Sequence, residues 1–287
     1  MVSKTSVGKW PVQLALLLAT QKVAALDYGL PWAADNTWGT TATQAGKLTW
    51  FHHWQMTSVQ QLVDGGAEYV PMLWGPKYES EWYNDIMPEF DANPPKHILA
   101  MNEPDIESQA NMSPEDAAGY YQSMLAPLRD RFEGVQISSP QLCYDIDWMK
   151  SFMDSLSQQG GHVDFLAIHH YQGWDSIDQL TQYVENIHNL WPDLKIWMTE
   201  YGVTSESGPS EQNVQDYMIE ATQWLEQTGY VDRAAWFGAF AVSNPPDDYA
   251  TGLNAIFNDD GSLRDQGRWW TQGGTFDAKK RSIEFRA

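Results

Sequence analysis

Short, apolar, β-prone segments alternate along the chain with longer segments that carry helix signals. Eight apolar segments follow residue 25, and we predict strands at 27–31, 48–52, 68–73, 97–101, 136–139, 165–169, 195–199 and 234–238. We predict helices at 113–132, 147–157, 177–190 and 211–227. The first of these has the clearest start, because Ser113 can cap it and Pro114 suits its first turn. This alternation is typical of βαβ units and a parallel sheet.

The number of repeats decides between two parallel architectures. Eight strand-helix repeats in roughly 250 residues have the size of the (β/α)8 barrel, whose active sites form at the carboxyl ends of the strands. An open doubly wound sheet is the alternative, but no glycine-rich phosphate loop follows the first strand. We therefore predict an α/β fold with a single (β/α)8 TIM barrel.

The two ends of the chain differ from its middle. Residues 1–25 have basic residues (Lys4 and Lys9), an apolar run at 12–19 and small residues at 23–25, as in a secretory signal peptide. The apolar run is much shorter than the ~20 residues of a membrane-spanning helix. We predict a secreted protein with one domain at 26–275 and a mobile basic tail at 276–287.

Acidic residues dominate the charge of the chain, with 38 Asp and Glu against 17 Lys and Arg and a net charge of −21. Losing the three lysines of residues 1–25 changes this charge to −24. Such a protein repels phosphate backbones and anionic lipid surfaces, so we expect no nucleic-acid or membrane partner. Cys143 is the one cysteine, which excludes an intramolecular disulfide, and we expect a buried structural thiol in a monomer.

Two glutamates follow apolar strands where a barrel places its active site. Glu103 follows the fourth predicted strand, directly after Asn102, and Glu200 follows the seventh, directly before Tyr201. Strands four and seven are three steps apart in a ring of eight, so their ends face each other across the opening. A lone glutamate is usually a solvated surface charge, but two at facing strand ends indicate catalysis.

A facing pair of carboxyl groups is what glycoside hydrolysis requires. One carboxylic acid protonates the leaving oxygen, and one carboxylate attacks or stabilises the anomeric carbon. The retaining route needs the two groups about 5–5.5 Å apart, and the inverting route about 6.5–9.5 Å. For facing strand ends of a small barrel, we predict the shorter distance.

Five short motifs stand at or near predicted strand ends. They are Gly29-Leu30-Pro31-Trp32, Met101-Asn102-Glu103-Pro104-Asp105, Ile168-His169-His170-Tyr171, Met198-Thr199-Glu200-Tyr201-Gly202 and Trp236-Phe237-Gly238. In these motifs the chain resembles glycoside hydrolase family 128, a clan A family of β-1,3-glucanase-like enzymes. The resemblance covers nearly all of residues 26–275 in the same order.

The resemblance implies a role for each glutamate. Glu103 would be the general acid/base and Glu200 the nucleophile of a retaining, double-displacement enzyme. The implied substrate is β-1,3-glucan, as polysaccharide or oligosaccharide, in a cell wall or storage glucan outside the cell, and no cofactor is implied. In this role Glu103 should have a raised pKa, while Tyr201 or Asn102 would donate hydrogen bonds that hold Glu200 ionised.

Aromatic and polar side chains near the strand ends are the candidates for sugar binding. Flat faces of Trp and Tyr pack well against pyranose rings, and the chain has 15 Trp and 13 Tyr. The predicted substrate-binding residues are Trp32, Trp50, Trp74, Asn102, His169, Tyr171, Tyr201 and Trp236. We interpret Trp269 and Trp270 differently, as closing packing of the last helix.

Two histidine doublets, at 52–53 and 169–170, raise the question of a metal site. Neighbouring residues of a strand point to opposite faces, so one doublet cannot readily bind one ion with both rings. We therefore predict no metal site. His170 departs from the family pattern, which often has an aromatic residue there, and the 50–54 segment places two histidines among aromatics.

Other functions stay open at this point. A non-enzymatic protein could bind β-1,3-glucan oligosaccharides in a tryptophan-lined cleft with weak or no catalysis, and a barrel enzyme for β-1,4-glucan or mannan could use the same glutamates. Esterase chemistry lacks its Gly-x-Ser-x-Gly elbow. The choice between endo and exo action depends on loop conformations, especially those of 35–47 and 243–253, which the pattern does not give.

Overall fold

The structure, a computed structural model, describes residues 25–54 and 57–273. The predicted signal peptide, apart from residue 25, and the predicted basic tail lie outside the described residues, and both stay predictions. Within the described part of the chain, no helix has the length and apolar character needed to cross a membrane.

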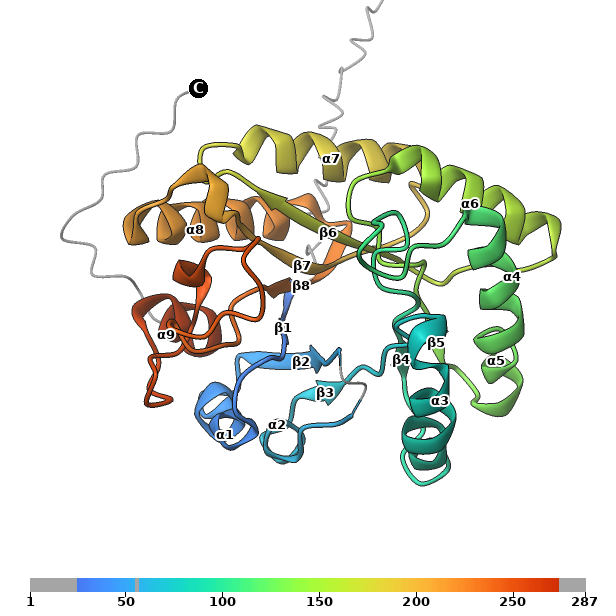
Figure 1. Cartoon of the computed structure of the whole chain (residues 1–287), viewed down its shortest axis with the longest axis horizontal. Helices are drawn as coiled ribbons and strands as arrows, with labels where there is room; N and C mark the ends of the chain where they lie inside the picture. Colours follow the sequence, from blue (N-terminus) through green and yellow to red (C-terminus); the bar gives the residue numbers. More distant parts are fainter. Residues whose placement is uncertain (1–24, 55–56, 274–287) are drawn as a thin grey trace, which may run out of the picture.

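Eight strands form the centre of the described structure (Figure 1): β1 (Asp27–Pro31), β2 (Leu48–His52), β3 (Glu68–Tyr69), β4 (His97–Ile98), β5 (Gln136–Ile137), β6 (Leu166–Gln172), β7 (Ile196–Val203) and β8 (Val231–Trp236). Six form one parallel sheet in the order β3-β2-β1-β8-β7-β6, and β4 pairs with β5. Single parallel bridges join the two sheets, at Met72–Leu99 and at Ser138–Phe165. The strands therefore follow one another around a ring whose ladders are interrupted at two places.

Helices surround this ring on its outer side (Figure 1): α1 (Gly39–Thr43), α2 (Gln60–Asp64), α3 (Glu79–Glu81), α4 (Pro114–Met124), α5 (Leu128–Arg131), α6 (Ile146–Gln158), α7 (Ile177–Leu190), α8 (Glu211–Thr228) and α9 (Asp265–Gln272). At least one of them lies in every connection between consecutive strands. The predicted (β/α)8 barrel is confirmed.

The strand bounds differ from the prediction in a way that shapes the site. β1 and β2 match it, whereas β3, β4 and β5 end early because the chain beyond them makes only isolated bridges. β6 and β7 continue past their predicted ends, to Gln172 and Val203, because their mutual pairing persists. These two strands therefore carry regular backbone geometry through the residues of the candidate site.

The predicted helix at 113–132 is two helices in the structure. Ser113 caps α4 as predicted, and its hydroxyl accepts a hydrogen bond of 3.1 Å from the Asp116 N–H. α4 ends at Met124, and α5 begins directly after Pro127. Proline has no N–H to donate to the preceding turn, which explains the break.

Aromatic side chains fill the barrel interior near the starts of the strands. The rings of Phe165 and Trp197 stack with centres 4.0 Å apart, and Trp50 lies 5.4 Å from Trp197. The Arg233 guanidinium lies 4.1 Å from the Trp197 ring. A Cβ at Gly29 would lie 2.2 Å from the Trp50 indole, so this strand position requires glycine. The filled interior leaves the carboxyl ends of the strands for a ligand.

The last helix packs against the first strand. Trp270 of α9 is fully buried, and its indole N–H donates a hydrogen bond of 2.9 Å to the Gly29 carbonyl. The interpretation of this tryptophan as closing packing is confirmed.

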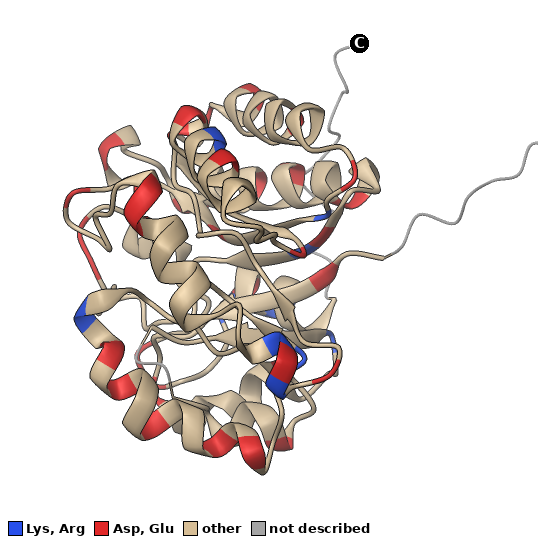
Figure 2. Ribbon diagram, turned by 90° about the vertical axis from the view of Figure 1, so that its right-hand side faces the viewer, with Lys and Arg blue, Asp and Glu red and all other residues tan. Residues whose placement is uncertain are grey.

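Acidic residues are spread over the outer helices and loops, with few basic ones among them (Figure 2). This distribution follows from the negative charge of the sequence. The long-range repulsion it produces acts on polyanions and not on an uncharged ligand.

Candidate active site

The backbone around Glu103 is held in an unusual conformation. Glu103 has φ of 43°, in the left-handed region that side chains other than glycine rarely adopt, at a cost of roughly 1–2 kcal/mol. Its N–H donates to the Gln141 carbonyl at 3.0 Å, and its carbonyl accepts from the Ile106 N–H at 3.1 Å. The strand end after β4 and the loop that follows thus fix this carboxyl group.

Glu200 lies within β7 and is directly opposite His169 of β6. The register of the two strands shifts between Ile168 and His169, next to this pair. Such an irregularity re-aims side chains at functional sites. Here it brings Glu200 and His169 to the same interior face as Glu103.

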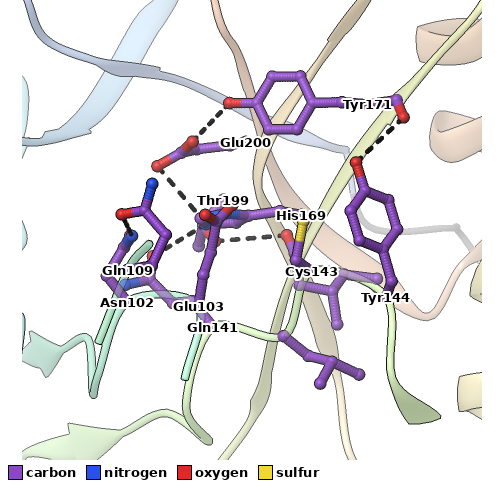
Figure 3. Close-up of polar contacts among 12 residues, drawn as sticks. Asn102, Glu103, Gln109, Gln141, Cys143, Tyr144, His169, Tyr171, Thr199 and Glu200 are labelled. Atoms are coloured by element: carbon purple, nitrogen blue, oxygen red, sulfur yellow. Dashed lines mark hydrogen bonds and ion pairs between the residues drawn. The ribbon is translucent and has the colours of Figure 1, made fainter. Parts of the chain in front are cut away.

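Glu103, His169 and Glu200 form one buried cluster (Figure 3). Nδ1 of His169 lies 2.6 Å from Oε1 of Glu103, and Nε2 lies 3.5 Å from Oε1 of Glu200. One oxygen of each glutamate and one ring nitrogen of His169 lie within 4.8 Å of one another. The two carboxyl groups predicted from distant parts of the chain therefore meet.

Two further side chains donate hydrogen bonds to Glu200. The Tyr171 hydroxyl donates to Oε2 at 2.5 Å, and the indole N–H of Trp54 donates to Oε1 at 2.9 Å. Both bonds favour the ionised carboxylate and fix its plane. The donors predicted for this task were Tyr201 or Asn102, and the structure corrects them to Tyr171 and Trp54.

Burial and neighbouring charges set the pKa values of the cluster. Burial raises the pKa of the Glu200 carboxyl to about 7, against the opposing effect of His169 and the hydrogen bonds from Tyr171 and Trp54. Burial lowers the pKa of His169, but the charges of Glu200 and Glu103 outweigh this effect and raise it above the ordinary value. Burial thus outweighs these opposing effects at Glu200 and brings its pKa close to neutral pH.

A cavity of about 780 Å³ opens above the cluster. Residues from seven strand ends and their loops line it: Trp54, Trp74, Asn102, Glu103, Ile106, Ser108, Gln109, Cys143, Tyr144, Tyr171, Glu200, Phe237, Pro246, Asp247, Asp248 and Tyr249. Asn102 donates an amide hydrogen to Gln109, and its buried carbonyl oxygen has no partner among the described residues.

The structure brings six of the ten predicted site residues together. Trp74, Asn102, Glu103, Tyr171 and Glu200 line the cavity, and His169 lies buried between the two glutamates. Trp32, Trp50, Tyr201 and Trp236 are fully buried and do not line it.

Each of these four side chains has a partner in the core instead. The Tyr201 hydroxyl bonds to Thr222 of α8 at 2.7 Å, because a strand residue next to inward-facing Glu200 points outward. The indole N–H groups of the three tryptophans donate within the protein, to Asn36, Asp27 and Asn254.

Sequence reasoning missed several cavity residues. Trp54 lies two residues past β2, in the aromatic segment noted as unusual, and this position was its only sequence signal. Phe237 directly follows Trp236, the last residue of β8, and Tyr144 lies in the connection after β5. The loop at 243–253 contributes residues 246–249 to the cavity wall. Cys143 is a buried thiol, as predicted, but it lies in the cavity wall.

Among the described residues, Glu103, His169 and Glu200 are the group whose donor atoms lie close enough together to hold a cation. His169 and Glu103 are already bound directly to each other at 2.6 Å, so an ion would have to break this bond. In the histidine doublet at 52–53, the ring of His52 forms a hydrogen bond of 3.0 Å with the Thr199 carbonyl. His170 packs against Tyr183 on the outer face of β6.

Comparisons with known proteins give the family. A model of the family described as glycosyl hydrolase catalytic core matches residues 29–270. Curated protein sequences yield no match.

Solved structures of family 128 enzymes are similar to this chain. A curdlan-specific exo-β-1,3-glucanase from Blastomyces gilchristii has 27% identity and a TM-score of 0.67, over 85% of this chain and 97% of that one. An exo-β-1,3-glucanase from Cryptococcus neoformans has 25% identity and a TM-score of 0.72, over 86% and 98%. An endo-β-1,3-glucanase from Amycolatopsis mediterranei, solved with laminaritriose, has 25% identity and a TM-score of 0.67, over 88% and 100%. The chain belongs to the glycosyl hydrolase catalytic core family, is a glycoside hydrolase, and is similar to the solved family 128 β-1,3-glucanases.

Proposed function

We propose that the protein is a secreted, retaining β-1,3-glucanase with Glu103 as the general acid/base and Glu200 as the nucleophile. The observation that carries this proposal is the approach of one oxygen of each carboxyl group to within 4.8 Å in a single cavity. This close approach of two carboxyl oxygens favours the about 5–5.5 Å separation of carboxyl groups in retaining enzymes over the about 6.5–9.5 Å of inverting ones.

In the first step, a Glu200 carboxylate oxygen attacks the anomeric carbon while Glu103 gives its proton to the leaving oxygen. The glycosidic C–O bond breaks, and a covalent ester joins the sugar to Glu200. In the second step, Glu103 takes up a proton from a water molecule whose oxygen attacks the same carbon, and the ester bond breaks. Two inversions give net retention.

His169 supports both roles of Glu103. Its Nδ1 is bonded to the Glu103 carboxyl at 2.6 Å, and the neighbouring carboxylates raise its pKa, which favours its protonated form. His169 can hold a proton next to Glu103, which must itself be protonated before the first step. Its positive charge also favours the ionised form of Glu200.

Support for a β-1,3-glucan substrate comes from the lining of the cavity and from the similar structures. Trp54, Trp74 and Phe237 offer aromatic surface for sugar rings, and Asn102 offers an unpaired carbonyl oxygen. The Amycolatopsis enzyme is solved with laminaritriose, laminaripentaose and laminarihexaose, partly as variants with a replaced glutamate. Secretion is proposed from residues 1–25 alone.

The proposal is tested by incubating the protein with laminarin and measuring new reducing ends. We expect hydrolysis by the unmodified protein and a loss of about 10²–10⁴-fold in Glu103→Gln and Glu200→Gln. Parallel incubations with β-1,4-glucan and with mannan would show, by new reducing ends, whether the enzyme acts on one of those polymers instead. Binding of laminari-oligosaccharides without any product would overturn catalysis and indicate a binding protein.

The two roles are separated by azide. In Glu103→Ala, azide should restore turnover of an activated aryl glucoside and give a β-glucosyl azide, because the ester on Glu200 still forms. In Glu200→Ala, azide takes the place of the missing nucleophile and should give the α-glucosyl azide. The reverse outcome would interchange the two assignments.

A further inference from the structure

Two tyrosines from separate loops meet at the wall of the cavity. The hydroxyl oxygens of Tyr144 and Tyr249 are 2.5 Å apart and share a hydrogen bond. Tyr144 lies in the connection between β5 and α6, and Tyr249 lies in the long connection after β8. Both line the cavity. The side-chain contact therefore links two loops that are more than 100 residues apart in sequence.

The backbone on each side of this pair is fixed. The carboxylate of Asp105 accepts hydrogen bonds from three consecutive N–H groups, at 143–145, at 2.8–3.1 Å. Asp247 accepts from the N–H groups of Tyr249 and Ala250 at 2.9 and 3.0 Å. The Tyr249 carbonyl accepts from Ser205 at 2.8 Å, just past the end of β7. The two tyrosines are thus parts of a built wall.

The pair lies on one particular side of the catalytic glutamates. Glu103 follows β4 and Glu200 lies in β7, so β5 and β6 stand between them on one side of the ring. The Tyr144 hydroxyl donates to the Tyr171 carbonyl of β6 at 3.4 Å, as Figure 3 shows. The Tyr249 ring lies 5.8 Å from the ring of Tyr171, whose hydroxyl binds Glu200. A sugar chain between the glutamates would meet this pair on its way out over β5 and β6.

The opposite side of the cavity offers a different surface. Trp54 and Trp74, which follow β2 and β3, line it together with Gln109. Trp54 also bonds Glu200 directly, so this aromatic surface begins at the reacting centre. A glucan held by the two glutamates thus has an aromatic path on one side and a tyrosine wall on the other.

We propose that the Tyr144–Tyr249 pair closes the cleft beyond the reacting sugar and restricts the enzyme to chain ends, so that it acts in exo mode. This inference rests on the proposed β-1,3-glucanase function and adds the mode of action and the residues that determine it. The terminal units of the glucan lie against the tyrosine wall, and the remainder of the chain leaves along Trp54 and Trp74. Each cut then releases a product of one fixed, short length.

The test compares products from two forms of β-1,3-glucan. The first is soluble laminarin, with oligosaccharide lengths followed over time. The second is dye-cross-linked curdlan, which releases dye only when internal bonds are cut. We expect one dominant short product and almost no dye from the unmodified protein. We expect Tyr249→Ala to lose the dominant product, give mixed lengths and release dye.

Two further variants keep the result interpretable. Tyr144→Phe keeps the ring and removes the shared hydrogen bond, and we expect it to shift the products in the same direction but less far. Tyr83→Ala removes a tyrosine that is 51% exposed outside the cavity, comparable to the 53% of Tyr249, and should keep the unmodified profile. Both Tyr83 and Tyr249 are exposed enough for truncation to leave the fold intact.

Two different failures are distinguishable. Mixed product lengths and early dye release from the unmodified protein would overturn the proposed mode of action while confirming β-1,3-glucan hydrolysis. A uniform product from Tyr249→Ala would show that the tyrosine wall is not what restricts the cleft. The absence of reducing ends from any β-1,3-glucan would overturn the proposed function, and the exo mode with it.

Discussion

Nδ1 of His169 lies 2.6 Å from a carboxyl oxygen of Glu103, within normal hydrogen-bond distance. The imidazole is fully buried, and its other nitrogen faces Glu200 at 3.5 Å. One side chain thus contacts both members of the proposed catalytic pair. The charges of Glu200 and Glu103 raise the pKa of His169, and the charge of His169 opposes the effect of burial on the pKa of Glu200.

The pH dependence of catalysis should follow Glu200. A nucleophile must be ionised, and burial raises the pKa of Glu200 to about 7, so kcat/KM of the unmodified enzyme should rise as pH increases through about 7. The charge of His169 lowers this pKa, and His169→Gln removes that charge. We expect the acidic limb of kcat/KM to move to higher pH in this variant. An unmoved limb would contradict the electrostatic role of His169.

Tyr171→Phe should weaken catalysis without altering the fold. The Tyr171 hydroxyl bonds Glu200 at 2.5 Å, and a hydrogen bond to a charged group contributes roughly 1.5–3 kcal/mol. We expect kcat/KM to fall about 10- to 100-fold. Tyr83→Phe, altered at a tyrosine outside the cavity, is the control. A fall in the control as large as in Tyr171→Phe would show that the effect is not specific.

Glu200→Gln should stabilise the protein most at neutral and alkaline pH. The folded-state pKa of Glu200, about 7, lies above its ordinary value of 4.5, so the folded state binds more protons between these values and loses stability as pH rises. Gln does not titrate and avoids this loss, which is at most roughly 3 kcal/mol. Thermal unfolding should show a Tm difference that grows from pH 4.5 to 7. A Tm difference that is constant over this pH range would contradict the raised pKa of Glu200.

Buried and cavity tryptophans should respond differently to truncation. Trp236 is fully buried and bonds the Asn254 carbonyl at 2.9 Å, so Trp236→Ala should lower the free energy of unfolding by about 3–5 kcal/mol. Trp74 lines the cavity, so Trp74→Ala should raise KM for laminari-oligosaccharides. Denaturant unfolding and kinetics on the folded fraction measure the two effects. A rise in KM for Trp236→Ala equal to that for Trp74→Ala would indicate that Trp236 contributes to substrate binding.

The fold and the meeting of Glu103 and Glu200 could be predicted because both depend on local patterns. Alternating apolar and amphipathic segments define strands and helices, and a glutamate at a strand end of a barrel is placed by the period of the ring. The predicted bounds of α7 match the structure, and those of β1 and β2 do too. Strand pairing then brings Glu103 and Glu200 together, as sequence position predicted.

The aromatic binding residues could not be predicted in the same way. Trp32, Trp50 and Trp236 lie in or beside strands as favourably as Trp74, but neighbouring elements cover them completely. Which face of a strand turns inward also decided between Tyr201, which bonds Thr222, and Tyr171, which bonds Glu200. Because neighbouring residues of a strand point to opposite faces, the inward direction of Glu200 turns Tyr201 outward.

The sequence by itself determined the barrel, the negative surface and the identity of the two glutamates, because these follow from composition and from the order of short segments. Only the tertiary structure decided the cavity wall, because its members come from loops whose paths depend on distant contacts. The hydroxyl contact of Tyr144 with Tyr249 exists only when the connections after β5 and β8 fold toward each other. Contacts between residues this far apart in sequence leave no local pattern, so only the folded chain defines the shape of the substrate site.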